Sequence, residues 1–114
     1  MAKFMFIYRA EPHAEEPSPE QMQAVMQSWT TWIAEGMKAG WMVDAGDALA
    51  PAGLVLRNSD VVTDGPFAES KELVNGYTVV KAESLESASG MAKDCPIFAG
   101  GGCLEIRQLT EILA

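Results

Sequence analysis

The chain has 114 residues, of which 48% are hydrophobic and 21% charged, and its formal net charge is −8. This length fits one domain, which is small enough to gain stability from burial against a second copy. The composition is ordinary for a globular protein and excludes a disordered, collagen-like or repeat chain. The eight Lys and Arg residues are scattered along an acidic chain. We therefore expect no binding to nucleic acid or to anionic membrane surfaces.

No apolar run is long enough for a signal-peptide core or a membrane span, so we expect a cytoplasmic protein. Cys95 and Cys103 form neither a CxxC pair nor a disulfide-dense pattern, and only His13 could join them as a nitrogen ligand. We expect free thiols that are buried or partly buried. The glycines at 100–102 lack the lysine and hydroxyl residue of a phosphate loop, which favours a flexible connector. We expect no cofactor and no metal.

Residues 3–9 predict a first strand, because apolar side chains fall on both of its faces. Phe4, Phe6 and Tyr8 share one face, and Met5 and Ile7 share the other. A small sheet with helices on one side would leave its other side in water. The doubly apolar strand therefore indicates that a second subunit's sheet covers that side.

Residues 11–19 are polar and contain three prolines, which is typical of a surface loop. His13 lies in this loop without a local partner, so we expect it to be solvated, with a catalytic role as the alternative. Ser18 then starts a helix as its N-cap, with Pro19 at the first position and Gln21 completing a capping box. Gly40 ends it. An apolar stripe at helical spacing predicts core, with a ligand pocket as the alternative; it comprises Met22, Val25, Met26, Trp29, Trp32, Ile33 and Met37.

Residues 41–49 predict a second strand, interrupted by Asp44 and Asp47 near Gly46. If this end of the strand opens into a cleft with apolar walls, Asp44 is a candidate acid or base, because burial raises the proton affinity of a carboxylate. A solvated strand end is the other interpretation.

A β-hairpin is predicted over residues 54–63, with its turn at Asn58-Ser59-Asp60. It leads into residues 64–72, which read DGPFAESKE and must contain a turn. Because Pro66 has no N–H, Asp64 needs another donor, such as a nearby amide or the Lys71 ammonium. Alternatively, Asp64 organises its own loop while Lys71 pairs with a neighbouring glutamate.

Residues 74–81 predict a third core strand, and Ser84 predicts the N-cap of a second helix that Pro96 ends. The predicted sheet-facing residues of this helix are Leu85, Ala88, Met91 and Ala92. Residues 103–109 predict the last strand, with Leu104 and Ile106 on one face and Glu105 and Arg107 on the other. Glu105 and Arg107 could form an ion pair, or Arg107 could hold an acidic ligand through a bidentate contact.

The motif DGPFAESKE, followed by Asn75-Gly76-Tyr77, resembles the signature of the DGPF group within the YCII-related family of small bacterial proteins. The resemblance covers nearly the whole chain as one domain, residues 1–114; it extends to Phe6-Ile7-Tyr8, Trp32, Gly40, Cys95-Pro96 and residues 104–107. It implies a ferredoxin-like unit that dimerises into an α+β barrel, with largely unassigned function. The predicted element order agrees: an α+β βαββαβ pattern with an extra β-hairpin, and an antiparallel sheet with two helices on one face.

Some relatives in this family are enzymes or suspected enzymes that use a histidine and an aspartate, the histidine on the first helix. Trp29 occupies that place here, and Asp44 is an approximate match for the aspartate. We therefore predict a homodimeric small-molecule-binding domain, with lyase- or isomerase-like activity on a small acidic compound as its candidate chemistry. The predicted site comprises Tyr8 and Trp29 as pocket wall, Asp44 as base, Arg107 with Glu105 as anion contact, and Asp64 with Lys71 at the rim.

Two other classes of function stay open. A non-catalytic interaction or regulatory module is the main alternative, because proteins resembling this group are often encoded near alternative sigma factors, which implies stress signalling. Such a module would present a flat apolar patch, whereas an enzyme needs a concave site. An RNA-binding sheet would carry exposed aromatic residues rimmed by basic ones, which the acidic balance disfavours.

Overall fold

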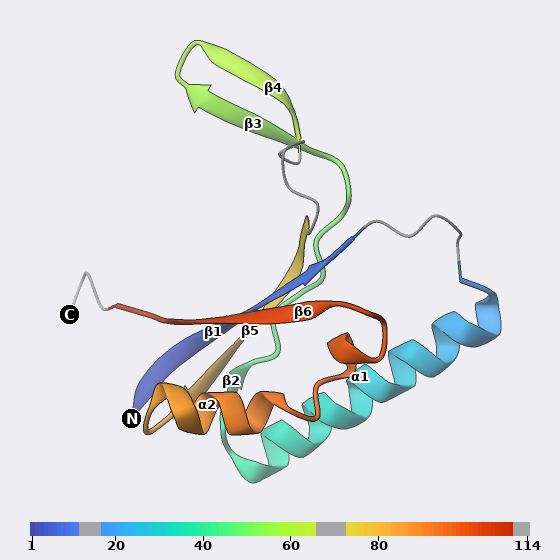
Figure 1. Ribbon diagram of the computed structural model, residues 1–114, viewed down its shortest axis with the longest axis vertical. Coiled ribbons are helices and arrows are strands. Elements are labelled where there is room, and N and C mark those ends of the chain that lie inside the picture. Colours follow the sequence, from blue (N-terminus) through green and yellow to red (C-terminus); the bar gives the residue numbers. More distant parts are fainter. Residues whose placement is uncertain (12–16, 66–72, 111–114) are drawn as a thin grey trace.

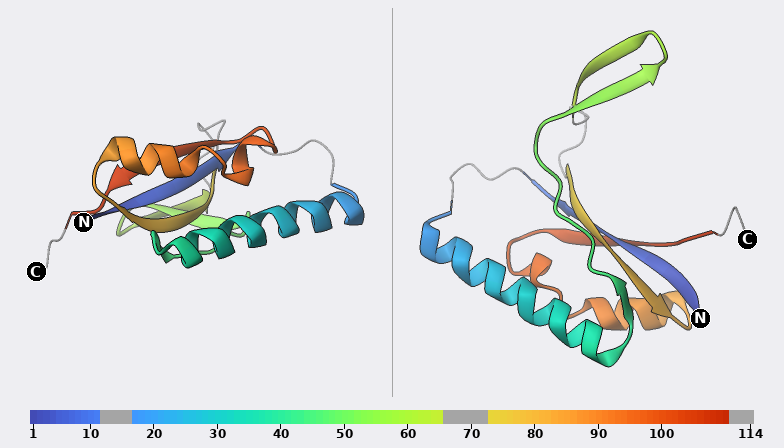
Figure 2. Two further views of the ribbon diagram at one scale, coloured as in Figure 1. Left: turned by 90° about the horizontal axis from the view of Figure 1, so that it is seen from below. Right: turned by 180° about the vertical axis from the view of Figure 1, so that it is seen from behind.

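The structure is a computed structural model that describes residues 1–11, 17–65 and 73–110. Its elements are β1 (Ala2–Ala10), α1 (Pro19–Ala39), β2 (Met42–Asp44), β3 (Gly53–Asn58), β4 (Val61–Gly65), β5 (Leu73–Ala82), α2 (Leu85–Ala92), the 3₁₀ turn η1 (Pro96–Phe98) and β6 (Cys103–Gln108) (Figure 1). Four strands form one antiparallel sheet in the order β2-β5-β1-β6. Both helices lie on the same side of it (Figure 2). This confirms the predicted α+β, ferredoxin-like fold.

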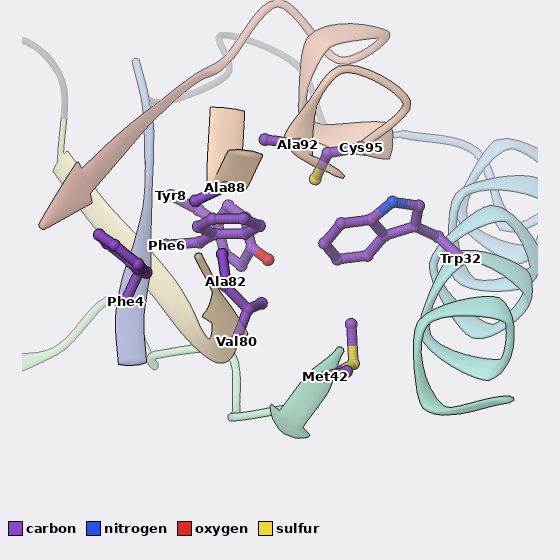
Figure 3. Close-up of a cluster of buried hydrophobic side chains, with 10 residues drawn as sticks. All are labelled: Phe4, Phe6, Tyr8, Trp32, Met42, Val80, Ala82, Ala88, Ala92 and Cys95. Atoms are coloured by element: carbon purple, nitrogen blue, oxygen red, sulfur yellow. The ribbon is translucent and has the colours of Figure 1, made fainter. Parts of the chain in front are cut away.

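The buried core lies between the sheet and the two helices. It is formed by side chains from β1, β2, β5, α1, α2 and the start of η1 (Figure 3); they are Phe4, Phe6, Tyr8, Trp32, Met42, Val80, Ala82, Ala88, Ala92 and Cys95. The alternation predicted for β1 is confirmed, because its even-numbered residues from Phe4 onward are buried while the odd-numbered ones between them are only half-buried or exposed.

Helix α1 begins and ends as its sequence predicts. The Ser18 hydroxyl accepts the amide of Gln21, and the Gln21 side chain accepts the amide of Ser18, which forms the capping box. At the other end Gly40 takes a left-handed conformation, with φ of 86°, and its amide donates to the carbonyls of Gly36 and Met37.

The prediction that the whole apolar stripe of α1 is core was wrong. Trp32 is buried and Trp29 and Ile33 are half-buried, but the stripe also contains exposed side chains; these are Met22, Val25, Met26 and Met37. The helix has 21 residues and extends past the sheet, so its first half has no strand beneath it (Figure 1). Periodicity identified the apolar face of the helix but could not reveal how much of that face the sheet covers.

The predicted second strand was too long. Only Met42–Asp44 forms β2, although the chain continues along β5 as far as an isolated bridge between Ala48 and Gly76. The interruption has two causes. The Asp44 carboxylate accepts the Gly46 amide at 2.8 Å, which makes a tight turn, and Gly46 has a φ of 71°. A Cβ at this glycine would collide with the carbonyl oxygen of Tyr77.

Two details of the predicted C-terminal half were also wrong. Helix α2 is capped by Ser84 as predicted, but it ends at Ala92, so Pro96 does not stop it and instead starts η1. Leu85 is half exposed and does not face the sheet. In the predicted glycine connector, the Gly102 amide donates to the carbonyl of Ile97 at 3.0 Å.

Strands β3 and β4 form the predicted hairpin, which we call the arm (residues 53–65). The Asn58 side chain shapes its turn by accepting the amides of Asp60 and Val61. The arm is a two-stranded sheet of its own and stands on the side of the main sheet away from the helices (Figures 1 and 2). The predicted DGPF turn begins where the arm ends, and its residues 66–72 lie outside the described part of the chain.

Candidate functional site

An open groove runs between α1 and residues 94–102. Its volume is about 1310 Å³. Apolar side chains from both walls line it, together with short polar side chains along α1; among them are Met22, Val25, Trp29, Trp32, Ile97 and Gln21. Concave, largely apolar surfaces with a few polar groups are typical of small-molecule sites.

Aromatic rings form the wall of the groove and continue into the core. Trp29 contacts Tyr8 edge to face with ring centroids 4.9 Å apart, and it contacts Trp32 in the same manner at 5.9 Å. Trp32 in turn meets Trp41 at 5.6 Å. Such edge-to-face pairs hold each ring in one orientation. The groove wall is therefore rigid, because it is anchored on the core.

A chain of buried polar contacts lies behind the groove. Cys95 lines the groove, and its thiol is next to the Tyr8 phenol. The Tyr8 hydroxyl donates to Thr78 Oγ1 at 2.6 Å, and the Thr78 hydroxyl donates to the carbonyl of Ala45 at 2.9 Å. The buried hydroxyls of Tyr8 and Thr78 each have a hydrogen-bond partner, as burial in a low-dielectric site requires.

The two titratable groups of this chain of contacts, Cys95 and Tyr8, keep their protons at neutral pH. Burial raises the pKa of the Cys95 thiol to about 11. Burial also raises the pKa of the Tyr8 phenol well above its ordinary value, against the lowering effect of its hydrogen bond to Thr78. The thiol is therefore not an activated nucleophile, and the phenol is a neutral hydrogen-bonding group.

The charged residues of the groove are acidic. Among the described lining residues the charged ones are Glu35 on α1 and Asp94 at the start of the opposite wall. No described lining residue is cationic. A carboxylate ligand would thus find no counter-charge in this part of the groove, whereas a neutral or cationic ligand meets aromatic faces and two carboxylates.

The sheet face away from the helices carries a different set of residues. Met5, Ile7, Tyr77 and Val79 form its apolar centre, and they are half-buried. Lysine and arginine side chains surround this centre on β1, β5 and β6: Lys3, Arg9, Lys81 and Arg107. We call this surface the open face. It holds four of the chain's eight Lys and Arg residues.

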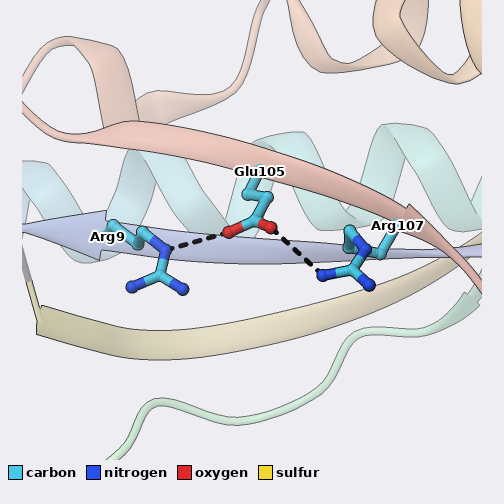
Figure 4. A network of polar contacts seen from close by, with 3 residues as sticks. All are labelled: Arg9, Glu105 and Arg107. Atoms are coloured by element: carbon cyan, nitrogen blue, oxygen red, sulfur yellow. Dashed lines mark hydrogen bonds and ion pairs between the residues drawn. The ribbon is translucent and has the colours of Figure 1, made fainter.

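Glu105 links two of these cations. Its carboxylate accepts Arg9 Nε at 3.1 Å and Arg107 Nη1 at 3.5 Å, on the side of the sheet away from the helices (Figure 4). This confirms the ion-pair interpretation of Glu105 and Arg107. The Arg107 side chain is 71% exposed, so solvent screens much of its charge.

The described residues of the predicted site lie in four places. Trp29 lines the groove, and Tyr8 packs behind it. Glu105 and Arg107 lie on the open face. Asp44 is exposed at the sheet edge opposite Val79, and Asp64 lies at the base of the arm. Lys71 and His13 lie outside the described residues. The structure does not gather the described ones into a single site.

Three residues of the groove were missed at the sequence level. Cys95 and Ile97 line it, and Thr78 holds the Tyr8 hydroxyl beneath it. In the sequence, Cys95-Pro96 was noted only as part of the resemblance to the YCII-related family, and no role in a pocket was assigned to it. Thr78 alternates with apolar residues in β5 like any strand threonine, and its role becomes evident only once Tyr8 is opposite it in space.

A sequence model of the YCII-related domain matches residues 2–113, nearly the entire chain. The chain belongs to the YCII-related domain family. Among proteins with curated descriptions, no significant match to this YCII-related chain was found. In the part of the chain that the structure describes, no helix is long and apolar enough to cross a membrane. Nor do three or more His, Cys, Asp or Glu residues of that part gather where they could hold a metal ion.

Proposed function

We propose that this YCII-related protein is a homodimeric small-molecule-binding domain whose ligand lies in the groove along α1. The observation that carries the proposal is the groove itself, with an aromatic wall that packs on the core and a protonated thiol at Cys95. This combination suits the binding of a compound with a planar apolar part. The tryptophans supply contact area at little cost in conformational entropy.

Dimerisation is part of the same proposal. It is supported by the apolar centre of the open face, which no element of the described chain covers, and by the barrel-like dimers that the family resemblance implies. A second copy related by a two-fold axis would bring two such faces together.

The charge of the groove supports a neutral or cationic ligand there. An acidic ligand, the class that the sequence favours, would instead be held by Arg107 at the margin of the open face, where the guanidinium is accessible. Lyase- or isomerase-like turnover needs a group that can transfer a proton. Within the described groove this role falls to Glu35 or Asp94, since the pKa of the Cys95 thiol is raised and Asp44 lies elsewhere.

The two placements of the ligand are tested by a thermal-shift screen at pH 6 and pH 8. The panel contains small carboxylic acids, lactones, neutral aromatic compounds and aromatic amines. A ligand that binds only the folded state raises the melting temperature by mass action. Ala24→Trp fills the groove from an exposed position on α1, and Ala34→Trp places the same side chain on α1 outside the groove.

A hit that Ala24→Trp abolishes and Ala34→Trp preserves supports binding in the groove. A hit that is lost only in Arg107→Ala places an acid on the open face instead. If no compound shifts the melting temperature of the wild type, the small-molecule proposal is rejected.

A second candidate function is a non-catalytic interaction or regulatory module. It is favoured by the exposed apolar side chains on the first half of α1, Met22, Val25 and Met26, of which Met26 is 60% exposed. Contiguous apolar surface of this kind is typical of a partner-binding site. This candidate gains support if the screen gives no hit while the protein is dimeric in solution.

A further inference from the structure

The arm has one exposed apolar face. Leu54 and Leu56 lie on it with 66% and 64% of their surface exposed, and Val62, directly across from Leu56, completes it. Asp64 lies on the same face, because it is paired with Leu54. The other face contains Val55, which is buried.

Nothing within the described chain packs against this face. Strands β3 and β4 pair with each other and with no other described strand. A two-stranded hairpin is marginally stable in water unless another surface covers its apolar side. These leucines are therefore open to a contact that the described elements of the subunit do not make.

The arm and the open face border the same space. The helices lie on one side of the main sheet, and the arm stands away from the sheet on the other side, as Figure 1 and the right view of Figure 2 show. A partner protein that binds the open face would also contact the arm. One partner can therefore cover both apolar surfaces.

The charges of the two surfaces are complementary. The open face carries Lys3, Arg9, Lys81 and Arg107 against Glu105, and with Asp44 at its edge the cations still outnumber the carboxylates by four to two. The described arm carries Asp60 and Asp64 against Arg57. Two open faces brought together alone would place like charges opposite each other. Acidic arms at their margins would reduce this repulsion.

We infer that the arm is an intersubunit clamp: its face of Leu54, Leu56 and Val62 packs on a second copy of this chain, with Asp64 near the basic margin of that copy's open face. By two-fold symmetry the contact is made twice. The inference rests on the proposed dimer and adds the apolar face of the arm as a second contact surface between the subunits. Nucleic acid is a poorer occupant, because Tyr77 is the one aromatic ring that β1, β5 and β6 present on the open face, and RNA-binding sheets of this topology stack two or three bases.

Hydrogen exchange of the full chain, followed by mass spectrometry across a dilution series, tests the clamp. Molar mass is measured by light scattering at the same concentrations. We expect arm amides to be protected in the dimer and to exchange at least about tenfold faster once dilution separates the copies. A dimer whose arm exchanges at one fast rate at every concentration overturns the clamp and leaves the dimer standing. A chain that is monomeric throughout overturns both.

Substitutions on the arm make the test specific. Leu54→Asn with Leu56→Asn should raise the dimer dissociation constant at least about tenfold, because it removes apolar contact without adding charge. The matched control is Leu85→Asn on α2, whose side chain is also half exposed and which should change the constant less than about twofold. Circular dichroism confirms that the sheet and helices persist. Equal dissociation constants for the double variant and the control would contradict the clamp.

Asp64→Asn examines the electrostatic part of the inference. Loss of one margin charge should raise the dissociation constant about threefold at low ionic strength, and the difference should vanish in high salt. An unchanged constant at low ionic strength would remove Asp64 from the interface.

Discussion

The two faces of the central sheet differ in what covers them. On the helix-covered face, Phe4, Phe6 and Val80 have almost no exposed surface. On the open face, Met5 and Ile7 come from the same strand and are similarly apolar, yet they are only half-buried. Because the alternating residues of β1 are apolar on both faces, the strand carries two apolar surfaces, and the subunit's own helices cover one of them.

The two faces therefore have different expected roles: one stabilises the fold of a single subunit, and the other is proposed to contact a second copy. The helix-covered face defines the fold of one subunit, because its core is closed by α1 and α2 (Figure 3). The open face and the arm add apolar surface that no element of the described chain covers. Substitutions on the two faces should therefore have different consequences, unfolding on one and dissociation on the other.

The largest effect is expected on the helix-covered face. Phe6→Ala should lower the free energy of unfolding by about 3–5 kcal/mol, because it leaves a cavity where a side chain with 0% exposure was packed against Trp32. Met5→Ala, one residue away on the open face, is the control and should cost less at concentrations where the protein is monomeric. Urea denaturation measures both. Equal losses would mean that the open face is already packed within one subunit.

A charge on the open face should separate the subunits without unfolding them. Ile7→Glu would place a carboxylate at the centre of the proposed interface, beside Glu105 on β6, at a cost of about 3 kcal/mol. The expected result is a monomer by light scattering with an unchanged circular dichroism spectrum. Ile7→Val, which conserves shape, should remain dimeric. A dimeric Ile7→Glu protein would show that the open face is not the interface.

Most of the fold followed from local chemistry that the sequence displays. The capping box at Ser18, the left-handed Gly40 and the alternation in β1 and β6 each act over a few residues, so their outcomes could be predicted. The errors came from tertiary context. The end of β2 depends on the approach of Gly46 to Tyr77, and the exposure of Met26 depends on where the sheet stops beneath α1.

The candidate site was harder to predict than the fold. Tyr8 and Trp29 are separated by a loop and a helix start, and their contact was anticipated only as a shared pocket wall. Cys95 and Ile97 reach the groove through the η1 turn, which has no periodic signal in the sequence. The clustering of positive charges on the open face could not be predicted either. An acidic chain with scattered cations gave no sign that half of them would meet on one face of a sheet.

The helix-covered face also predicts how stability depends on pH. The pKa of the buried Cys95 is raised from about 9 to about 11, so above pH 9 the unfolded chain loses a proton that the folded chain keeps. This contribution is fully present below pH 9 and is lost as the pH rises towards 11. Between pH 8 and pH 10 the free energy of unfolding should fall by about 1 kcal/mol.

Urea denaturation of Cys95→Ala over the same range provides the comparison. This variant should lose most of the slope between pH 8 and pH 10, whatever its overall stability. Tyr8 leaves a smaller residual slope, because about half of the phenol is ionised in the unfolded chain at pH 10, which corresponds to about 0.4 kcal/mol. An equally steep slope in the variant would assign the pH dependence to another group.

The smallest effect is expected at the margin of the open face. Arg107→Ala removes an exposed ion pair, and Arg9 still holds the Glu105 carboxylate at 3.1 Å. The free energy of unfolding should therefore change by no more than about 0.5 kcal/mol, and the dimer should persist. Binding of a small carboxylic acid, if thermal shift detects it in the wild type, should be lost. Glu105→Gln is the matched control, because it removes the carboxylate that pairs with Arg107 and should strengthen acid binding. Unchanged affinity in Arg107→Ala would exclude this arginine as the anion contact and leave the groove along α1 as the remaining site.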